Sequence, residues 1–408
     1  MRVLMVHNRY LIRGGEEESA AAESELLRRN GHEVDLYQEY NERVAGLSKL
    51  RLALKTVWSS ESYHILRHRL KERKYDLVHV QNFFPLISPA IYYAARAEGV
   101  RVVQSLRNYR LLCPSAVLFR DGQLCQECVG RSVAWPGIVH ACYRGSRGGT
   151  ATVAAMLAFH RQLRTWERMV DVFIALTAFA RDKLVEGGLP ADKIVVKPNF
   201  VADDPAPGTG TAGYALFVGR LSPEKGLGTV LEAWQRLRGA IPLKVVGEGP
   251  LGASAEHAAA QGPGIEYLGR RPLQQVYHLM GEARFLILPS EWYEPFGRVA
   301  IEAFARGTPV IASDIGGMAD LVDDGHTGRL FRPGDADDLV AKVEWALRHP
   351  GELARMRDAA RKAFEARYTA AQNYLELMAI YRRALAGAAP VAARQPSYKA
   401  RATSPTRP

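Results

Sequence analysis

Short apolar runs rich in β-branched residues alternate with longer segments of helical periodicity along most of the chain. Runs that are apolar at nearly every position are typical of strands buried on both faces of a parallel sheet. The pattern predicts strands at residues 3–6, 33–36, 77–80, 102–104, 172–175 and 194–196 in the first half, and at residues 215–218, 243–246, 265–268, 285–288 and 309–312 in the second. The fold class that follows is α/β, with doubly wound sheets covered by helices.

The alternation is interrupted by one stretch without periodicity that is rich in Pro, Gly and Asp. This stretch, residues 199–213, is typical of an interdomain linker. It predicts an N-terminal domain at residues 1–198 and a C-terminal domain at residues 214–368, with ligand at the carboxyl ends of the strands. A last helix is expected at residues 369–387. The Ala-, Pro- and Arg-rich tail, residues 388–408, is predicted to be disordered.

The composition, 47% hydrophobic and 24% charged, is that of an ordinary globular protein. No apolar run reaches the roughly 18 residues of a membrane span, and the first apolar run is too short for a signal peptide. A cytoplasmic protein is therefore expected. The net charge is +11, and residues 1–200 carry 29 Lys and Arg against 20 Asp and Glu. A basic half suits anionic ligands, and the absence of any nucleic-acid-binding motif makes nucleic acid an unexpected partner.

The segment 43–74 concentrates basic residues around apolar positions, such as Leu50 and Leu54, that have helical spacing. An amphipathic basic helix followed by a basic stretch suits the anionic surface of a membrane. A helix packed on the core with a solvated basic face is an equally good interpretation of the same pattern.

Cationic side chains follow a strand at the start of the second domain. The motif FVGRLSPEKGL, residues 217–227, places Gly219, Arg220 and Lys225 on the loop after that strand. The next strand ends in VVGEGPLG, where Gly247 begins a Gly-rich turn. Fixed cations of this kind stabilise the negative charge that gathers on a departing nucleoside diphosphate.

Two acids follow in PSEWYEPFGRVAIEAFARGTPV, residues 289–310. Glu294 lies on the loop after a strand, and a helix is predicted to begin near Gly297, so that Glu302 falls in its second turn. The amide groups of a helix N-terminus also attract phosphate. Carboxylates beside a diphosphate would repel it, so they should face neutral hydroxyl groups.

Loops at the ends of three strands in the first domain carry further candidates. Gly14 and Gly15 precede a helix, and glycines let the backbone approach a ligand closely; a flexible loop before a good helix start is the alternative. Gln81 and Arg107 each follow a strand. Arg107 stays protonated and is no general base, but its guanidinium suits a phosphate of an acceptor.

The segments 217–227 and 290–310 resemble the donor site of the retaining glycosyltransferases of family 4 (glycosyl transferases group 1), which have the GT-B fold of two facing Rossmann-like domains. Glu294 and Glu302 meet the E-x7-E spacing of that family, and EPFG and EAFARGTPV match around them. The resemblance spans roughly residues 1–385 and implies that the last helix crosses back to the first domain.

The resemblance implies roles for these residues. Arg220 and Lys225 would hold the diphosphate, Glu294 the donor sugar and Glu302 the ribose, and the loop at Leu268 would lie near the base. The implied donor site also includes Gly219, Gly247, Pro295, Phe296 and Gly297, and the implied acceptor side includes Gly14, Gly15, Gln81 and Arg107. Related sequences often carry His where this chain has Gln81 and Arg107, so an inactive sugar-nucleotide-binding protein is an alternative.

The function expected from the resemblance is transfer of a hexose from a nucleoside diphosphate sugar to a lipid-linked or polysaccharide acceptor, with retention, at the cytoplasmic face of a membrane. No cofactor is expected for catalysis, because Asp335 of the D-x-D sequence is placed to cap a helix. GEGPLG at residues 247–252 follows a strand and opens a helix, so an NAD-dependent oxidoreductase is an alternative. A nucleotide-sugar epimerase is another.

All four cysteines, Cys113, Cys125, Cys128 and Cys142, fall in an insert at residues 107–148. A central CxxC in a chain expected in a reducing compartment favours a structural zinc site of four thiolates. Free thiols, disulfides and an iron–sulfur cluster are the alternatives. A metal would help to order a segment with little obvious core.

Overall fold

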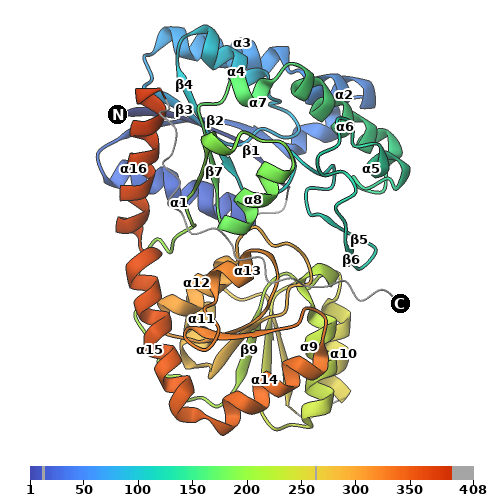
Figure 1. Cartoon of the computed structure of the whole chain (residues 1–408), viewed down its shortest axis with the longest axis vertical. Coiled ribbons are helices and arrows are strands. Elements are labelled where there is room, and N and C mark those ends of the chain that lie inside the picture. The colour runs from blue at the N-terminus through green and yellow to red at the C-terminus, as the bar shows by residue number, and fades with distance from the viewer. Residues whose placement is uncertain (12–13, 262–263, 388–408) are drawn as a thin grey trace.

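The computed structural model describes residues 1–11, 14–261 and 264–387. Two six-stranded sheets, each flanked by helices, lie one above the other in Figure 1. Each strand predicted from the apolar pattern has a counterpart in these sheets. Within the described residues, no helix is long and apolar enough to cross a bilayer. The predicted tail, residues 388–408, lies outside the described residues.

The first sheet is parallel throughout, in the order β2-β1-β3-β4-β7-β8. Its strands are β1 (Arg2–Arg9), β2 (Glu33–Tyr40), β3 (Leu77–Asn82), β4 (Arg101–Leu106), β7 (Val172–Ala175) and β8 (Ile194–Val196). The helices of this domain are α1 (Gly15–Arg29), α2 (Lys49–Val57), α3 (Ser60–Glu72), α4 (Ala90–Ala97), α5 (Trp135–Val139), α6 (Arg147–Gln162), α7 (Thr165–Arg168) and α8 (Ala178–Glu186). The central strand β3 is buried at every position, because helices cover both faces of the sheet.

The second sheet is also parallel, in the order β11-β10-β9-β12-β13-β14. Its strands are β9 (Ala215–Val218), β10 (Leu243–Val246), β11 (Ile265–Gly269), β12 (Phe285–Leu288), β13 (Val310–Ser313) and β14 (Gly328–Phe331). The helices are α9 (Leu227–Leu237), α10 (Gly252–Gln261), α11 (Leu273–Glu282), α12 (Arg298–Ala305), α13 (Gly316–Leu321), α14 (Ala336–Arg348) and α15 (Pro350–Arg367). The edge strand β14 was not among the predicted strands, because GRLF is short and carries a charge.

A small antiparallel hairpin lies in the insert between β4 and α6. Its strands are β5 (Phe119–Arg120) and β6 (Gln123–Leu124). The hairpin projects from the side of the first domain toward the second in Figure 1.

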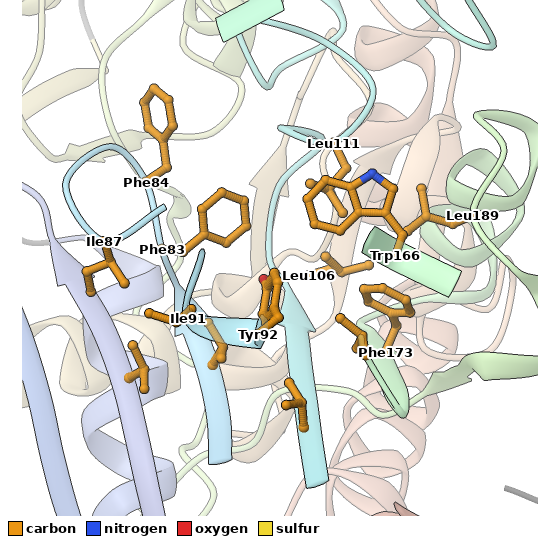
Figure 2. Packing of buried hydrophobic residues seen from close by; sticks show 14 of the residues in the cluster. Phe83, Phe84, Ile87, Ile91, Tyr92, Leu106, Leu111, Trp166, Phe173 and Leu189 are labelled. Carbon is orange, nitrogen blue, oxygen red and sulfur yellow. The ribbon is translucent and has the colours of Figure 1, made fainter. Parts of the chain in front are cut away.

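Aromatic packing supports the carboxyl ends of β3 and β4. Phe83, Tyr92 and Trp166 come from three segments, and their ring centroids lie 6.0–6.3 Å apart. Figure 2 shows these rings with Leu106 and Phe173, all in one buried cluster. Rings of this size contribute a large buried apolar area at the base of the loops that follow these strands.

The last helix, α16 (Ala370–Ala386), leaves the second domain and packs against the first (Figure 1). Leu377, Tyr381 and Ala384 are buried with residues of β1, β3 and β4. The Tyr381 hydroxyl and His79 Nδ1 of β3 are hydrogen-bonded at 2.7 Å. The predicted GT-B fold, with its C-terminal helix crossing back, is therefore confirmed.

We expect Tyr381→Ala to lower the free energy of unfolding by about 3–5 kcal/mol, because it leaves a cavity in the core and removes the hydroxyl partner of His79 Nδ1. Urea unfolding measures the loss. The control is Leu375→Ala on the same helix, since Leu375 is 61% exposed. Equal losses in the two variants would contradict the proposed packing of α16.

Candidate functional site

Loops at the carboxyl ends of β9 and β10 are pressed together at Gly219 and Gly247. The amide of Gly219 donates to the Val246 carbonyl at 3.0 Å. Gly247 has φ +144°, and a Cβ on it would lie 1.8 Å from the carbonyl oxygen of Gly219. A side chain cannot occupy that position. Gly247, in the predicted Gly-rich turn, therefore allows the backbones of the two loops to approach each other closely.

Lys225 and Glu294 form an ion pair, with 2.5 Å between Nζ and Oε1. Lys225 ends a short turn after β9, and Glu294 lies on the loop after β12. The second oxygen of Glu294 accepts a hydrogen bond of 2.7 Å from Ser290 Oγ. Arg220, on the same loop as Lys225, is exposed and forms no ion pair with any residue that the structure describes. Three of the predicted residues thus lie on neighbouring loops at the carboxyl end of the second sheet, namely Arg220, Lys225 and Glu294.

Glu302 lies in the second turn of α12, as predicted, and is buried. Its Oε1 accepts from Arg298 Nη2 at 3.2 Å. Burial raises the pKa of Glu302, against the attraction of Arg298. A buried carboxylate with one long ion pair has capacity left for hydroxyl donors. Gly297 caps this helix, and Pro295 and Phe296 are buried beside it, Phe296 within the core of the second domain.

The start of α1 faces the start of α12 across the two domains. Arg298 Nη1 donates to Ser19 Oγ of α1 at 3.4 Å, and a Cβ on Gly15 would lie 3.7 Å from Arg298 Cδ. Gly14 is the exposed N-cap of α1. Arg298 was not among the predicted site residues. The feature that could have identified it is a cation at the first position of a helix, where the helix dipole disfavours positive charge unless a tertiary partner compensates it.

Two further contacts join the domains next to the EPFG loop. Thr177 Oγ1, at the start of α8, donates to the Pro295 carbonyl at 3.2 Å. The Phe179 amide donates to Asp320 Oδ2 at 2.7 Å. The loop that carries Glu294 is therefore held by both domains. Leu268, predicted near the base, is half-buried at the end of β11.

Gln81 and Arg107 belong to a buried network around Glu23 of α1. Arg107 Nη2 and Gln81 Nε2 donate to Glu23 Oε2 at 2.9 and 2.7 Å. Lys197 Nζ donates to Glu23 Oε1 at 2.7 Å. The Arg107, Glu23 and Lys197 side chains are at most 3% exposed. Arg107 Nη1 donates to Asn199 at 2.6 Å.

The prediction that Arg107 binds an acceptor phosphate is therefore wrong, because its donors are directed at protein groups. Burial by itself would raise the pKa of Glu23, but attraction to Lys197 and Arg107 prevails and holds that pKa far below its usual range. Burial lowers the pKa of His79 to about 4, so this neighbour is neutral at pH 7. The network carries two cations and one carboxylate.

The four cysteines are free thiols that line one small cavity beside the hairpin. No three His, Cys, Asp or Glu side chains within the described residues stand in a metal-ligating arrangement. Asp335 of the D-x-D sequence caps α14, accepting from the Asp338 amide at 2.9 Å, as predicted.

Both domains match known protein families. Residues 14–199 match the family described as glycosyl transferase 4-like domain, and residues 205–363 match glycosyl transferases group 1. The structure resembles that of the Anabaena protein HepE in complex with UDP, with a TM-score of 0.68 at 17% identity over 93% of this chain and 99% of that one. A likeness at this identity concerns the fold, which is GT-B. The chain belongs to the glycosyltransferases of this fold, with a 4-like first domain and a group 1 second domain.

Curated relatives are similar over part of the chain. Glycogen synthase of Mycobacterium tuberculosis is 32% identical over 239 residues, which is 55% of this chain and 57% of that protein. The lipopolysaccharide 1,2-N-acetylglucosaminetransferase of Salmonella typhimurium is 34% identical over 150 residues, 33% of this chain and 39% of that protein. The alignment with the first relative thus spans little more than half of its length.

We expect Glu23→Gln to lower the free energy of unfolding by about 3–5 kcal/mol, because it leaves two buried cations without a counter-charge. Glu23 has a lowered pKa in the folded state, so its contribution is present above the usual carboxyl pKa of 4.5 and is lost as the pH falls below it. The difference between wild type and variant should narrow in acid. Urea unfolding at neutral and acid pH measures it.

The control for this prediction is Glu25→Gln, since the Glu25 side chain on the same helix is 53% exposed and pairs with Arg29 on the surface. Its effect should stay within about 0.5 kcal/mol. A variant of Glu23 as stable as this control at every pH would contradict the charge balance assigned to the network.

Proposed function

We propose that the chain transfers a sugar from a nucleoside diphosphate sugar to an acceptor hydroxyl, with retention of the anomeric configuration. The observation that carries the proposal is the ion pair of Lys225 with Glu294, which lies beside the loop of Arg220 and before the helix of Glu302, with the start of α1 opposite. Support for a nucleotide-sugar donor comes from the complex of the Anabaena relative with UDP.

The diphosphate would lie against exposed Arg220 and Lys225. Lys225 is already paired with Glu294, so a bound phosphate would share this cation and leave Glu294 to accept hydroxyl groups of the donor sugar. Glu302, buried and incompletely hydrogen-bonded, would accept from the ribose hydroxyls. Both acids then face neutral donors, which avoids repulsion of the diphosphate.

The reaction we propose is a same-face displacement. The bond from the anomeric carbon to the diphosphate oxygen breaks, and a bond from that carbon to the acceptor oxygen forms. The acceptor proton passes to the departing phosphate oxygen, whose negative charge Arg220 and Lys225 stabilise. In this proposal the fixed cations replace a catalytic metal ion. The D-x-D sequence serves helix capping, which supports that assignment.

The acceptor we propose is lipid-linked or a polysaccharide. The relatives from Salmonella, a lipopolysaccharide N-acetylglucosaminetransferase, and from Mycobacterium, a glycogen synthase, support this class. A membrane-facing surface would serve a lipid-linked acceptor. The segment 43–74 forms two helices, α2 and α3, and not the predicted single helix with a basic stretch.

Helix α2 is the part of that segment suited to a membrane. Leu50 and Leu54 are 71% and 63% exposed, and the exposed Lys49 and Arg51 flank Leu50. Many cations of α3 instead pair with acids, as Arg67 does with Glu98 at 2.6 Å. We propose that α2 rests on an anionic membrane surface, with the leucines inserted and the two cations at the headgroups.

We expect UDP, GDP or ADP to bind by calorimetry, with UDP the first to test. Lys225→Ala should weaken binding about tenfold to a hundredfold, because one charge-assisted contact is lost. The matched control is Lys342→Ala on α14, whose lysine pairs with Asp338 away from the proposed site. Equal affinities of the two variants would remove Lys225 from the donor site.

Glu302→Gln is expected to reduce kcat/KM for transfer at least about a hundredfold, with Glu344→Gln on α14 as control. The assay follows release of nucleoside diphosphate with polysaccharide or lipid acceptors, and nuclear magnetic resonance reads the anomeric configuration. Isomerised donor formed without acceptor would identify an epimerase. Donor binding without turnover on any acceptor would identify a binding protein.

Flotation with vesicles tests the membrane proposal. We expect the wild type to float with vesicles containing anionic phospholipid, and the double variant Leu50→Asp and Leu54→Asp to lose most of that binding. Leu375→Asp on α16 is the control, since Leu375 is similarly exposed. Vesicle binding that is unchanged in the double variant would refute the membrane proposal. So would a wild type that does not float but forms a dimer, seen in size-exclusion chromatography, that depends on the two leucines.

A further inference from the structure

The insert between β4 and α6 brings its four cysteines together from separate points of the chain. Cys113 follows the turn after β4, Cys125 and Cys128 follow β6, and Cys142 follows α5. With Ser115, Arg120 and Gly137 they line one small cavity.

Backbone hydrogen bonds hold these segments in place. The Cys125 amide donates to the Leu118 carbonyl at 2.9 Å, and the Cys142 amide donates to the Gly137 carbonyl at 3.0 Å. A Cβ on Gly137 would lie 3.0 Å from Pro114 Cγ and 3.5 Å from Cys128 Sγ. The walls of the cavity are thus packed.

Part of the insert packs on the core of the first domain, through buried residues such as Leu112 and Leu118. Around the CxxC turn and α5 the buried apolar cluster is small and consists of Cys128, Ala134 and, from α6, Ala154. Trp135 and Val139 of α5 are 54% and 53% exposed. A segment with so little buried apolar surface is generally held by a metal or disulfides. All four thiols here are free.

We propose that Cys113, Cys125, Cys128 and Cys142 bind one Zn²⁺ as a closed, structural site of four thiolates. The thiols line the cavity without converging on one point. A change of χ1 moves a cysteine sulfur without moving the backbone, and binding would draw the four sulfurs to about 2.3 Å from the ion. Four protein ligands leave no open position, so the ion supplies structure and no chemistry.

The charge around the cavity fits such an ion. Zn²⁺ with four thiolates carries a net charge of about −2. Arg120 lines the cavity, and its guanidinium is held there by Glu127 at 2.9 Å. Arg161, whose Nη2 donates to the Leu111 carbonyl at 3.3 Å, interacts electrostatically with Cys128. The two guanidinium groups partly offset the negative charge of the site, since Asp121 and Glu127 also pair with Arg120.

The CxxC turn, residues 125–128, also touches the second domain. Gln126 Nε2 donates to the Tyr293 hydroxyl at 3.0 Å, and Lys183 Nζ donates to Gln126 Oε1 at 2.7 Å. Tyr293 precedes Glu294. A metal that fixes this turn would therefore brace the loop that carries Glu294, a consequence that rests on the proposed function.

The test is the metal content of the full chain, purified without added metal or chelator. Mass spectrometry of the elements should find about one zinc per chain, and Cys125→Ser or Cys142→Ser should reduce it to background. Ser115→Ala is the matched control, because Ser115 Oγ lies 3.1 Å from Cys113 Sγ but is no ligand. His140→Ala, the nearest histidine variant in sequence, should also keep its zinc.

A second measurement does not depend on folding of the variants. Titration of the wild type with an organomercurial should release one zinc for about four thiols. The proposal would be overturned if the native protein contained no metal and its four thiols reacted at once, or if it contained two disulfides. Iron in place of zinc, or loss of zinc in His140→Ala, would also overturn it. Zinc without nucleotide binding would refute the proposed function alone, and nucleotide binding without zinc would refute the metal site alone.

Discussion

The ion pairs of Glu23 with Lys197 and Arg107 stabilise the region where the chain passes from the first domain to the second and returns. The three side chains come from α1, from the end of β8 and from the end of β4, and all are buried. Lys197 also donates to Asn373 of α16 at 3.1 Å. The network therefore joins the segment where the chain leaves the first domain to the helix by which it returns. A low local dielectric makes such a network strong when complete and destabilising when one member is lost.

The second domain places charge differently, because the cations of its two site pairs, Lys225 and Arg298, have side chains that are 24% and 21% exposed. Lys225 pairs with Glu294 and Arg298 pairs with Glu302, and this pairing orients the two acids. In the proposed function, the same pairing would limit repulsion between the acids and a diphosphate. Arg298 also reaches Ser19 in the first domain. The geometry of the candidate site therefore depends on how the two domains are held together.

Much of the fold and part of the site could be predicted from the sequence. The apolar runs located the strands, because a strand buried on both faces is apolar at nearly every position. The spacing of Glu294 and Glu302 placed one acid on a loop and the other in a helix, as the structure has them. The edge strand β14 was missed because an edge position requires fewer apolar residues. Arg107 was misread, since its exposure and its partners depend on α1 and on residue 199, both far away in sequence.

The sequence by itself therefore determined which segments are buried and which loops carry charge, because periodicity and local chemistry are written in neighbouring residues. Only the tertiary structure decided which charges meet. Glu23 and Lys197, or Gln126 and Tyr293, are separated by more than 160 residues, and their contacts follow from the packing of sheets and helices. The pKa of an ionisable group and the energy of its interactions depend on burial and on neighbouring charges, and both are properties of the folded chain.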